Sequence, residues 1–205
     1  GGISCFAVPA DTPGISYGRN EAKMGWKSQP TRAVILEDAR IPADCLIGEE
    51  GQGFRIAMAG LDGGRINIAS CSLGAAQAAL HQAQQYVQER KQFGQAIGDF
   101  QTVQFTLADM ATEVHAARVA TMHSATLKDQ GHPFLMEASM AKLLASEMCN
   151  NVSTKAIQVH GGIGYLQETG VERIFRDARV TTIYEGTSEV QRLLIARKLL
   201  EQYPV

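Results

Sequence analysis

Apolar residues recur at intervals of three and four over two long stretches of this 205-residue chain, and this pattern constrains the fold more than any other feature. Positions at such intervals share one face of an α-helix, so each stretch predicts a helix whose apolar face must be covered. Gly131 and Pro133 separate the stretches and predict a short turn, so we expect two antiparallel helices. The apolar positions are Val103, Leu107, Met110, Val114 and Ala117, then Met140, Leu144, Met148, Val152, Ala156 and Val159.

Two further helices are predicted on either side of this pair. Residues 54–89 have helical character and are rich in Ala and Gly, whose small side chains allow close packing or the close approach of a ligand. The last helix is predicted to start near Thr187 or Ser188, where Ser188 and Gln191 have the spacing of a capping box. Four helices predict a C-terminal α-helical bundle domain over residues 53–205.

The first quarter of the chain has a different character. Residues 3–8 and 33–36 favour β-strands and are separated by turn-rich sequence, as in an antiparallel sheet. Two strands alone do not make a stable sheet. We therefore expect residues 1–52 to be the trailing strands of a β-domain whose other strands precede them. The predicted fold class is mainly α, a four-helix bundle preceded by those strands, in a chain that is a fragment.

Composition argues against several classes of function. Nineteen Lys and Arg against 21 Asp and Glu give a net charge of −2, so there is no strong positive field for nucleic acid or an anionic membrane. The cysteines form no C-x-x-C pair and the histidines no H-E-x-x-H pair, so no metal site is predicted. No apolar run approaches the roughly 20 residues that a membrane-spanning helix needs.

The most informative stretch, IYEGTSEVQR, occupies residues 183–192 and contains Glu185 in a loop before the last helix. Partial desolvation beside Ile183 and Tyr184 would make this carboxylate a better proton acceptor near neutral pH. The alternative is a solvated loop residue, which is the commoner environment of Glu. Backbone N–H groups at Gly186 and at the helix start could also bind a phosphate or another ligand oxygen.

Three other motifs each have an ordinary structural interpretation, and two of them also allow a functional one. Arg90, in ERKQFG, either caps the end of a helix or binds a pyrophosphate. The glycines of QVHGGIG, residues 158–164, either end a helix or lie against a planar cofactor. Asp62 and Arg65, in GLDGGR, are spaced as a surface ion pair on a helix. None of these motifs decides the function alone.

Taken together and in order, six segments resemble the acyl-CoA dehydrogenase family across essentially the whole chain. They are GLDGGRINIAS, ERKQFG, DFQTVQF, QVHGGIGY, RDARV and IYEGTSE. In that family, the part matching residues 24–42 belongs to a central β-domain and the remainder forms a C-terminal four-helix domain. The resemblance implies an FAD-dependent enzyme that removes an α-proton and a β-hydride from an acyl-CoA.

The resemblance also implies a role for particular residues. Glu185 corresponds to the catalytic base. In one subgroup, which includes isovaleryl-CoA dehydrogenases, the base instead occupies the position of Gly64, which has no carboxylate here. Residues near the acyl-CoA are implied to be Asp62, Arg65 and Gly186. FAD contacts are implied at Arg90, Phe93, Gln101, Thr187 and Glu189, and at Gln158, Gly161 and Gly162 from a neighbouring subunit.

Substrate and partners are implied less sharply. Residues 63–76 resemble isobutyryl-CoA dehydrogenases of valine breakdown, whereas residues 183–196 equally resemble butyryl-CoA enzymes. The resemblance implies a homotetramer that passes electrons to an electron-transfer flavoprotein, in the mitochondrial matrix of a eukaryote or the cytoplasm of a bacterium. The isolated 205 residues would be inactive. Two alternatives are a non-catalytic helical assembly module and an acyl-CoA oxidase.

Overall fold

The computed structural model describes residues 2–202 and contains two compact units, residues 1–62 and 63–205. The division falls within helix α1 (Gly53–Glu89), which begins in the first unit and continues into the second. Within the described residues, no helix is long and apolar enough to cross a membrane. The expected mainly α fold, with short strands ahead of a helical domain, is confirmed.

The first unit contains two small antiparallel pairs of strands. Strand β1 (Cys5–Phe6) pairs with β4 (Leu46–Ile47), and β2 (Ile15–Tyr17) pairs with β3 (Val34–Leu36). The two stretches predicted as strands therefore do not pair with each other. Each has a partner that the sequence pattern did not single out. Val34 and Leu36 are 62% and 60% exposed, so the β2–β3 pair leaves its apolar side chains uncovered.

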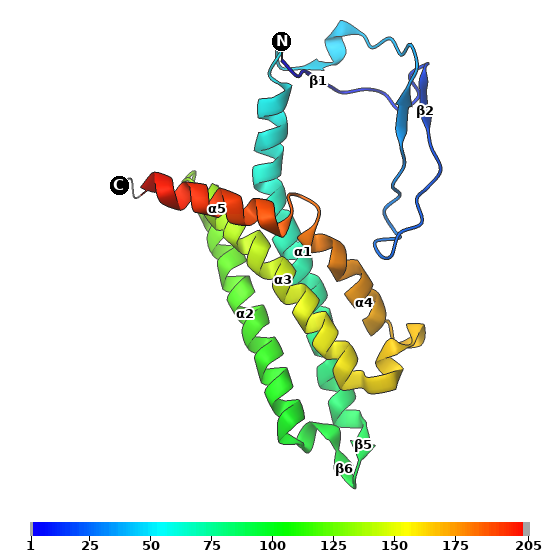
Figure 1. Cartoon of the computed structure of the whole chain (residues 1–205), viewed down its shortest axis with the longest axis vertical. Helices are drawn as coiled ribbons and strands as arrows, with labels where there is room; N and C mark the ends of the chain where they lie inside the picture. The colour runs from blue at the N-terminus through cyan, green and yellow to red at the C-terminus, as the bar shows by residue number, and fades with distance from the viewer. Residues whose placement is uncertain (1, 203–205) are drawn as a thin grey trace. The chain divides into compact units, whose positions relative to one another are not determined.

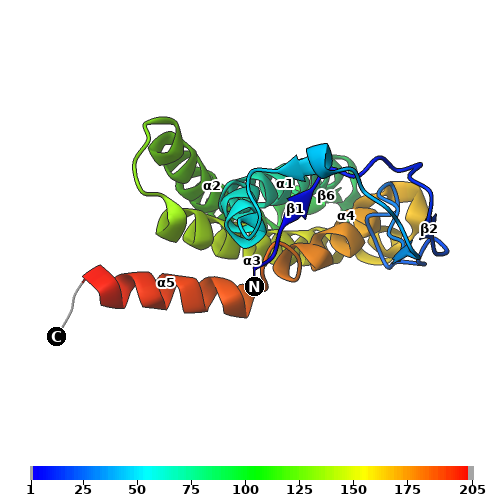
Figure 2. The same cartoon turned by 90° about the horizontal axis from the view of Figure 1, so that it is seen from above.

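The second unit is helical and is organised around α3 (Leu135–His160). Helix α2 (Gln101–Asp129), the short α4 (Val171–Ala178) and α5 (Ser188–Gln202) all pack against α3. Helices α2 and α3 are antiparallel, as expected, whereas α5 crosses α3 near one end (Figures 1 and 2). The turn between α2 and α3 passes through Gly131, whose φ of +73° suits glycine.

Small side chains form much of the core between α1, α2 and α3. Fully buried members include Ala69, Ala76, Met110, Ala145 and Val152, and the α4 residues Val171 and Ala178 pack against the same cluster. Alanine at such positions lets helix backbones approach closely without leaving voids. The prediction that Met140 and Leu144 lie on the buried face was wrong. They are 36% and 42% exposed, because the small residues Ala141 and Ala145 face the core instead.

In the helical unit, helix α4 and the hairpin of β5 (Lys91–Gln92) and β6 (Gln95–Ala96) were not predicted. Helix α4 has eight residues, of which four are charged, so its sequence has no long apolar stripe. Arg176 Nε lies 2.6 Å from Glu172 Oε2, one helical turn away, and the two side chains form an ion pair. The hairpin turns through Phe93 and Gly94 at φ values of +53° and +84°. Phe-Gly is not the usual sequence signal for such a turn.

Candidate active site

An unusual backbone conformation marks the loop before α5. Glu185 and Gly186 both have positive φ, +53° and +86°. Glycine tolerates this region, but a residue with a long side chain seldom adopts it unless surrounding contacts impose it. The loop joins a 3-10 helix, Arg179–Thr182, to α5 and carries the Glu185 side chain back against α1.

The Glu185 carboxylate lies against the backbone of α1 at Gly64. A Cβ atom placed on Gly64 would lie 2.6 Å from Glu185 Oε2 and 3.1 Å from its Cδ. The carboxylate thus occupies space that any other residue at position 64 would fill. Glu185 Oε2 is buried and has no hydrogen-bond partner among residues 2–202. A buried acceptor without a partner costs free energy, and it can accept a proton from a ligand.

Two buried side chains hold the loop by its carbonyl oxygens. Lys142 Nζ donates to the Gly186 carbonyl at 2.8 Å, and Gln191 Nε2 donates to the same oxygen at 3.0 Å and to the Glu185 carbonyl at 3.1 Å. Both side chains are fully buried. Burial lowers the pKa of Lys142 below its ordinary value, and the negative charge of Glu185 opposes that shift.

The predicted capping box at the start of α5 was wrong. Thr187 caps the helix, because its Oγ1 accepts the Val190 N–H at 3.3 Å. Ser188 Oγ is buried and has no hydrogen-bond partner in the described part of the chain, and the Gln191 amide serves the loop carbonyls instead. Glu189 is exposed, and the backbone N–H at the helix start, together with the Thr187 hydroxyl, lowers its pKa.

Of the predicted substrate residues, Gly186 and Arg65 lie near Glu185. Arg65 follows Gly64 in α1 and is only 6% exposed, so it is buried rather than on the surface. Its charge also acts on Lys142. Asp62 lies one helical turn before Arg65 in α1. Thr187 and Glu189 line a hollow of about 390 Å³ beside the loop, together with Glu147, Asn150, Arg179, Thr182, Ile183 and Ser188.

The remaining predicted residues lie at the other end of the helical unit. Gly64 and Glu89 are 25 residues apart in α1, which corresponds to about 37 Å along the helix. The hairpin beyond Glu89 carries Arg90 and Phe93, and Phe93 is 92% exposed with its ring edge-on to Phe100 at 6.2 Å. Gln101 starts α2 and is also exposed.

The C-terminal end of α3 lies at the same end as this hairpin (Figure 1). The rings of Tyr86, on α1, and His160, on α3, stack at 4.4 Å and connect the two regions. Gln158, Gly161 and Gly162 are exposed there. Within one chain, therefore, the residues implied for FAD fall into two separate groups, one beside Glu185 and one at the far end of α1.

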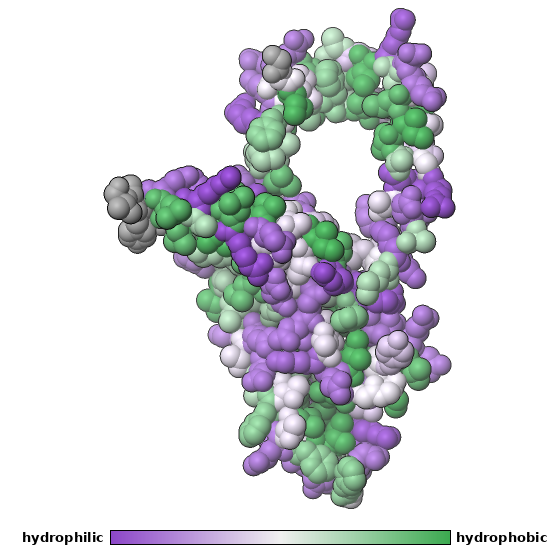
Figure 3. Space-filling model, viewed as in Figure 1, coloured by the Kyte–Doolittle hydropathy of each residue, from purple (hydrophilic) through white to green (hydrophobic). Residues whose placement is uncertain are grey.

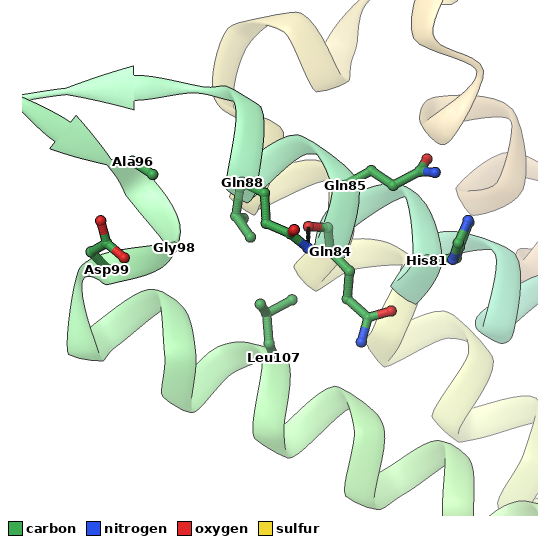
Figure 4. Close-up of a pocket in the computed structure, with 9 residues that line it drawn as sticks. His81, Gln84, Gln85, Gln88, Ala96, Gly98, Asp99 and Leu107 are labelled. Atoms are coloured by element: carbon green, nitrogen blue, oxygen red, sulfur yellow. Dashed lines mark hydrogen bonds between the residues drawn. The ribbon is translucent and has the colours of Figure 1, made fainter.

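A second hollow lies between α1, the segment after β6 and α2 (Figure 4). Three amides from the end of α1, Gln84, Gln85 and Gln88, line one side of it, with Asp99 opposite, and the other lining residues are His81, Val87, Ala96, Gly98 and Leu107. Asp99 begins the DFQTVQF segment, but none of the residues implied for FAD or acyl-CoA binding lines this hollow. Exposed apolar residues are scattered among polar ones over the visible face of the helical unit (Figure 3). No cluster of three potential metal ligands is present within residues 2–202.

Comparison with known proteins identifies the family. Residues 51–200 match the family model of the acyl-CoA dehydrogenase C-terminal domain. The chain belongs to the acyl-CoA dehydrogenase family. It is 50% identical over 202 residues to the mitochondrial isobutyryl-CoA dehydrogenase of Bos taurus and 52% identical over 202 residues to the mitochondrial short-chain specific acyl-CoA dehydrogenase of Homo sapiens. Each match covers 98% of this chain and 49% of the relative, so the chain spans about half the length of these relatives.

Solved structures agree with this assignment. Butyryl-CoA dehydrogenase from Megasphaera elsdenii superposes with a TM-score of 0.95 at 45% identity, covering 97% of this chain and 52% of that one. An acyl-CoA dehydrogenase from Bacillus anthracis complexed with FAD superposes with a TM-score of 0.94 at 33% identity, covering 98% of this chain and 38% of that one. By sequence alone, a subunit of the caffeyl-CoA reductase–Etf complex of Acetobacterium woodii is 49% identical over 201 residues, which cover 98% of this chain and 53% of that relative.

Proposed function

We propose that this chain is the C-terminal half of an FAD-dependent acyl-CoA dehydrogenase that converts a short acyl-CoA to the 2-enoyl-CoA, with Glu185 as the base. The observation that carries the proposal is the buried Oε2 of Glu185, which has no partner in the described residues and lies against Gly64. An unpartnered carboxylate oxygen gives no structural benefit, so its position favours catalysis over a non-catalytic assembly module.

The proposed chemistry begins with the α-proton of the thioester, which is weakly acidic. Glu185 Oε2 takes this proton while hydrogen bonds to the thioester carbonyl stabilise the developing enolate charge. The backbone N–H of Glu185 donates no hydrogen bond within residues 2–202 and is available for that carbonyl. FAD, when bound, supplies the acceptor for the hydride that leaves the β-carbon. Gly64 leaves room for the base and provides no second carboxylate.

The residues present fit FAD binding at both ends of the helical unit. Arg90 is an exposed cation suited to a pyrophosphate, and Phe93 exposes an aromatic ring held at a strained φ of +53°. A Cβ atom placed on Gly161 or on Gly162 would have no heavy atom within 4 Å, so there is room for a planar group to approach the backbone of these glycines. Because these residues lie far from Glu185, we propose that Arg90, Phe93, Gln101, Gln158, Gly161 and Gly162 reach FAD across a subunit contact, while Thr187 and Glu189 contact it near Glu185.

A homotetramer would also cover apolar surface that this chain leaves exposed. On α5, Leu193 and Leu200 are 48% and 71% exposed.

The exposed apolar side chains of the β2–β3 pair support the further proposal that residues 1–52 complete a larger β-domain, with residues 53–205 as the helical domain. The relative in an Etf complex supports an electron-transfer flavoprotein as the electron acceptor. The compartment would be the mitochondrial matrix or the bacterial cytoplasm, according to the source.

Anaerobic titration of the full-length enzyme with isobutyryl-CoA and with butyryl-CoA tests the proposal. We expect the absorbance of the bound flavin to bleach, and the thioester that bleaches it at lower concentration is the preferred substrate. The relatives do not separate the two, since their identities are 50% and 52%. A full-length protein that contains FAD but bleaches with neither thioester would contradict a short acyl-CoA substrate.

A further inference from the structure

Lys142, in the middle of α3, is fully buried, which is unusual for a lysine. Burying an ammonium group costs free energy unless hydrogen bonds or nearby opposite charges offset the loss of solvent. A helix that only needed to pack would have an apolar residue at this position. The buried ammonium therefore calls for a role other than packing.

The contacts of Lys142 lead directly to the loop that carries Glu185. Its Nζ donates to the carbonyl oxygen of Gly186 at 2.8 Å, a bond between residues 44 positions apart. A hydrogen bond from a charged donor is about twice as strong as a neutral one. The same carbonyl accepts the Gln191 amide at 3.0 Å, so two donors from two helices hold one peptide group. That peptide joins Gly186, the second residue with positive φ, to Thr187, and the Gln191 amide also binds the carbonyl of the preceding peptide, between Glu185 and Gly186.

We propose that Lys142 is a positioning residue, whose buried ammonium holds the Gly186 carbonyl and thereby keeps Glu185 in its left-handed conformation with the carboxylate against Gly64. The inference rests on the function proposed above and adds a residue to it. Without Lys142, the neutral Gln191 amide is the one donor to the Gly186 carbonyl within residues 2–202, so the loop is held less firmly against relaxation of Glu185 toward ordinary φ values. Such a relaxation would move the carboxylate away from Gly64.

The charges around Lys142 make its ammonium part of the electrostatics of the base. Glu185, Glu147 and Glu189 present negative charge to it from the loop, from α3 and from α5, and Arg65 presents positive charge from α1. The positive charge of Lys142 in turn attracts the Glu185 carboxylate.

Replacing Lys142 by Met in the full-length enzyme tests the proposal, because Met has a similar length but neither charge nor donor. We expect a loss of roughly 10²-fold in the rate of flavin bleaching, as for a displacement of about 1 Å at a reacting group. FAD content and KM should stay within threefold, so the loss should fall on the rate and not on substrate affinity. The matched control is Lys155→Met on the same helix, which removes a contact to Glu113 at 2.8 Å and should leave the rate within threefold.

If Lys142→Met yields no folded flavoprotein, Lys142→Ala with added propylamine decides the question. Rescue of at least tenfold by the amine, with none by propanol, supports the role of the ammonium, and the absence of rescue overturns it. Glu185→Gln measured alongside separates the two proposals. An inactive Glu185→Gln enzyme with a fully active Lys142→Met enzyme overturns only the positioning role. An active Glu185→Gln enzyme overturns both the base and its positioning.

Discussion

Substituting Gly64 by Ala should impair catalysis without unfolding the protein. The new Cβ would lie 2.6 Å from Glu185 Oε2, whereas ordinary contacts begin at 3.4 Å, so the carboxylate must move by roughly 0.8 Å or more. The carboxylate is the far end of a flexible side chain, so the movement itself strains little. Alanine also gains up to about 1 kcal/mol over glycine in a helix, which offsets that strain. Because a shift of about 1 Å in a reacting group can cost 10²-fold, we expect a loss of roughly that size in rate.

The assay is the single-turnover rate of flavin bleaching in the full-length enzyme, measured beside the thermal unfolding midpoint. Gly74→Ala is the matched control, since Gly74 lies in the same helix and a Cβ atom placed on it would have no heavy atom within 4 Å. It should leave the rate unchanged and stabilise the helix slightly. A Gly64→Ala enzyme that bleaches as fast as the wild type would refute the placement of the carboxylate. A loss of rate in both variants would instead point to a general requirement for glycine in α1.

Three further predictions follow from other features of the structure. Gly186→Ala should lower the free energy of unfolding by about 1–2 kcal/mol in urea denaturation at pH 7, since its φ of +86° is unfavourable for alanine; an unchanged value would contradict the assigned conformation. Burial raises the pKa values of Tyr184 and Cys149 to about 12. Both groups have a higher pKa in the folded protein than in the unfolded chain. The free energy of unfolding is therefore highest below the ordinary pKa values and decreases as the pH rises toward 12. This decrease should be smaller in Tyr184→Phe than in the wild type. Equal dependence of the unfolding free energy on pH in the two proteins would exclude Tyr184 as a cause of it. Arg90→Ala and Phe93→Ala should each weaken FAD binding to the full-length enzyme by roughly tenfold or more, about 1.4 kcal/mol, without lowering the unfolding midpoint of the FAD-free protein, because both side chains are exposed; unchanged affinity in equilibrium dialysis would remove them from the FAD site.

The sequence predicted the long helices because their apolar periodicity is a local signal. Helices α2 and α3 extend over the expected stretches, and residues 54–89 fall within α1. The orientation of α3 was harder to predict, because alanines rather than Met140 and Leu144 face its neighbours. The short α4 depends on packing of Val171 and Ala178 against the core, which a charged eight-residue segment does not reveal.

The site was predictable where a motif identified it and not where distant residues meet. Glu185 was identified from its motif, but its contact with Gly64 depends on how the loop and α1 pack. The roles of Lys142 and Gln191 were missed. The sequence pattern places Gln191 in a capping box, whereas its amide binds the loop carbonyls, and the bond from Lys142 to the loop joins residues 44 positions apart. The apolar pattern gave no signal for a buried lysine, because it placed Met140 and Leu144, and not Ala141, on the buried face of the helix.

The central claim is that Glu185 removes the α-proton, and Glu185→Gln in the full-length enzyme tests it most directly. Glu168→Gln, at an exposed position, is the matched control. A general base contributes about 10²–10⁴-fold, so we expect Glu185→Gln to lose at least 10²-fold in the rate of flavin bleaching by the preferred thioester while keeping its FAD and its unfolding midpoint. The control should bleach at the wild-type rate. Bleaching of the Glu185→Gln enzyme at the wild-type rate would contradict the assignment of the base.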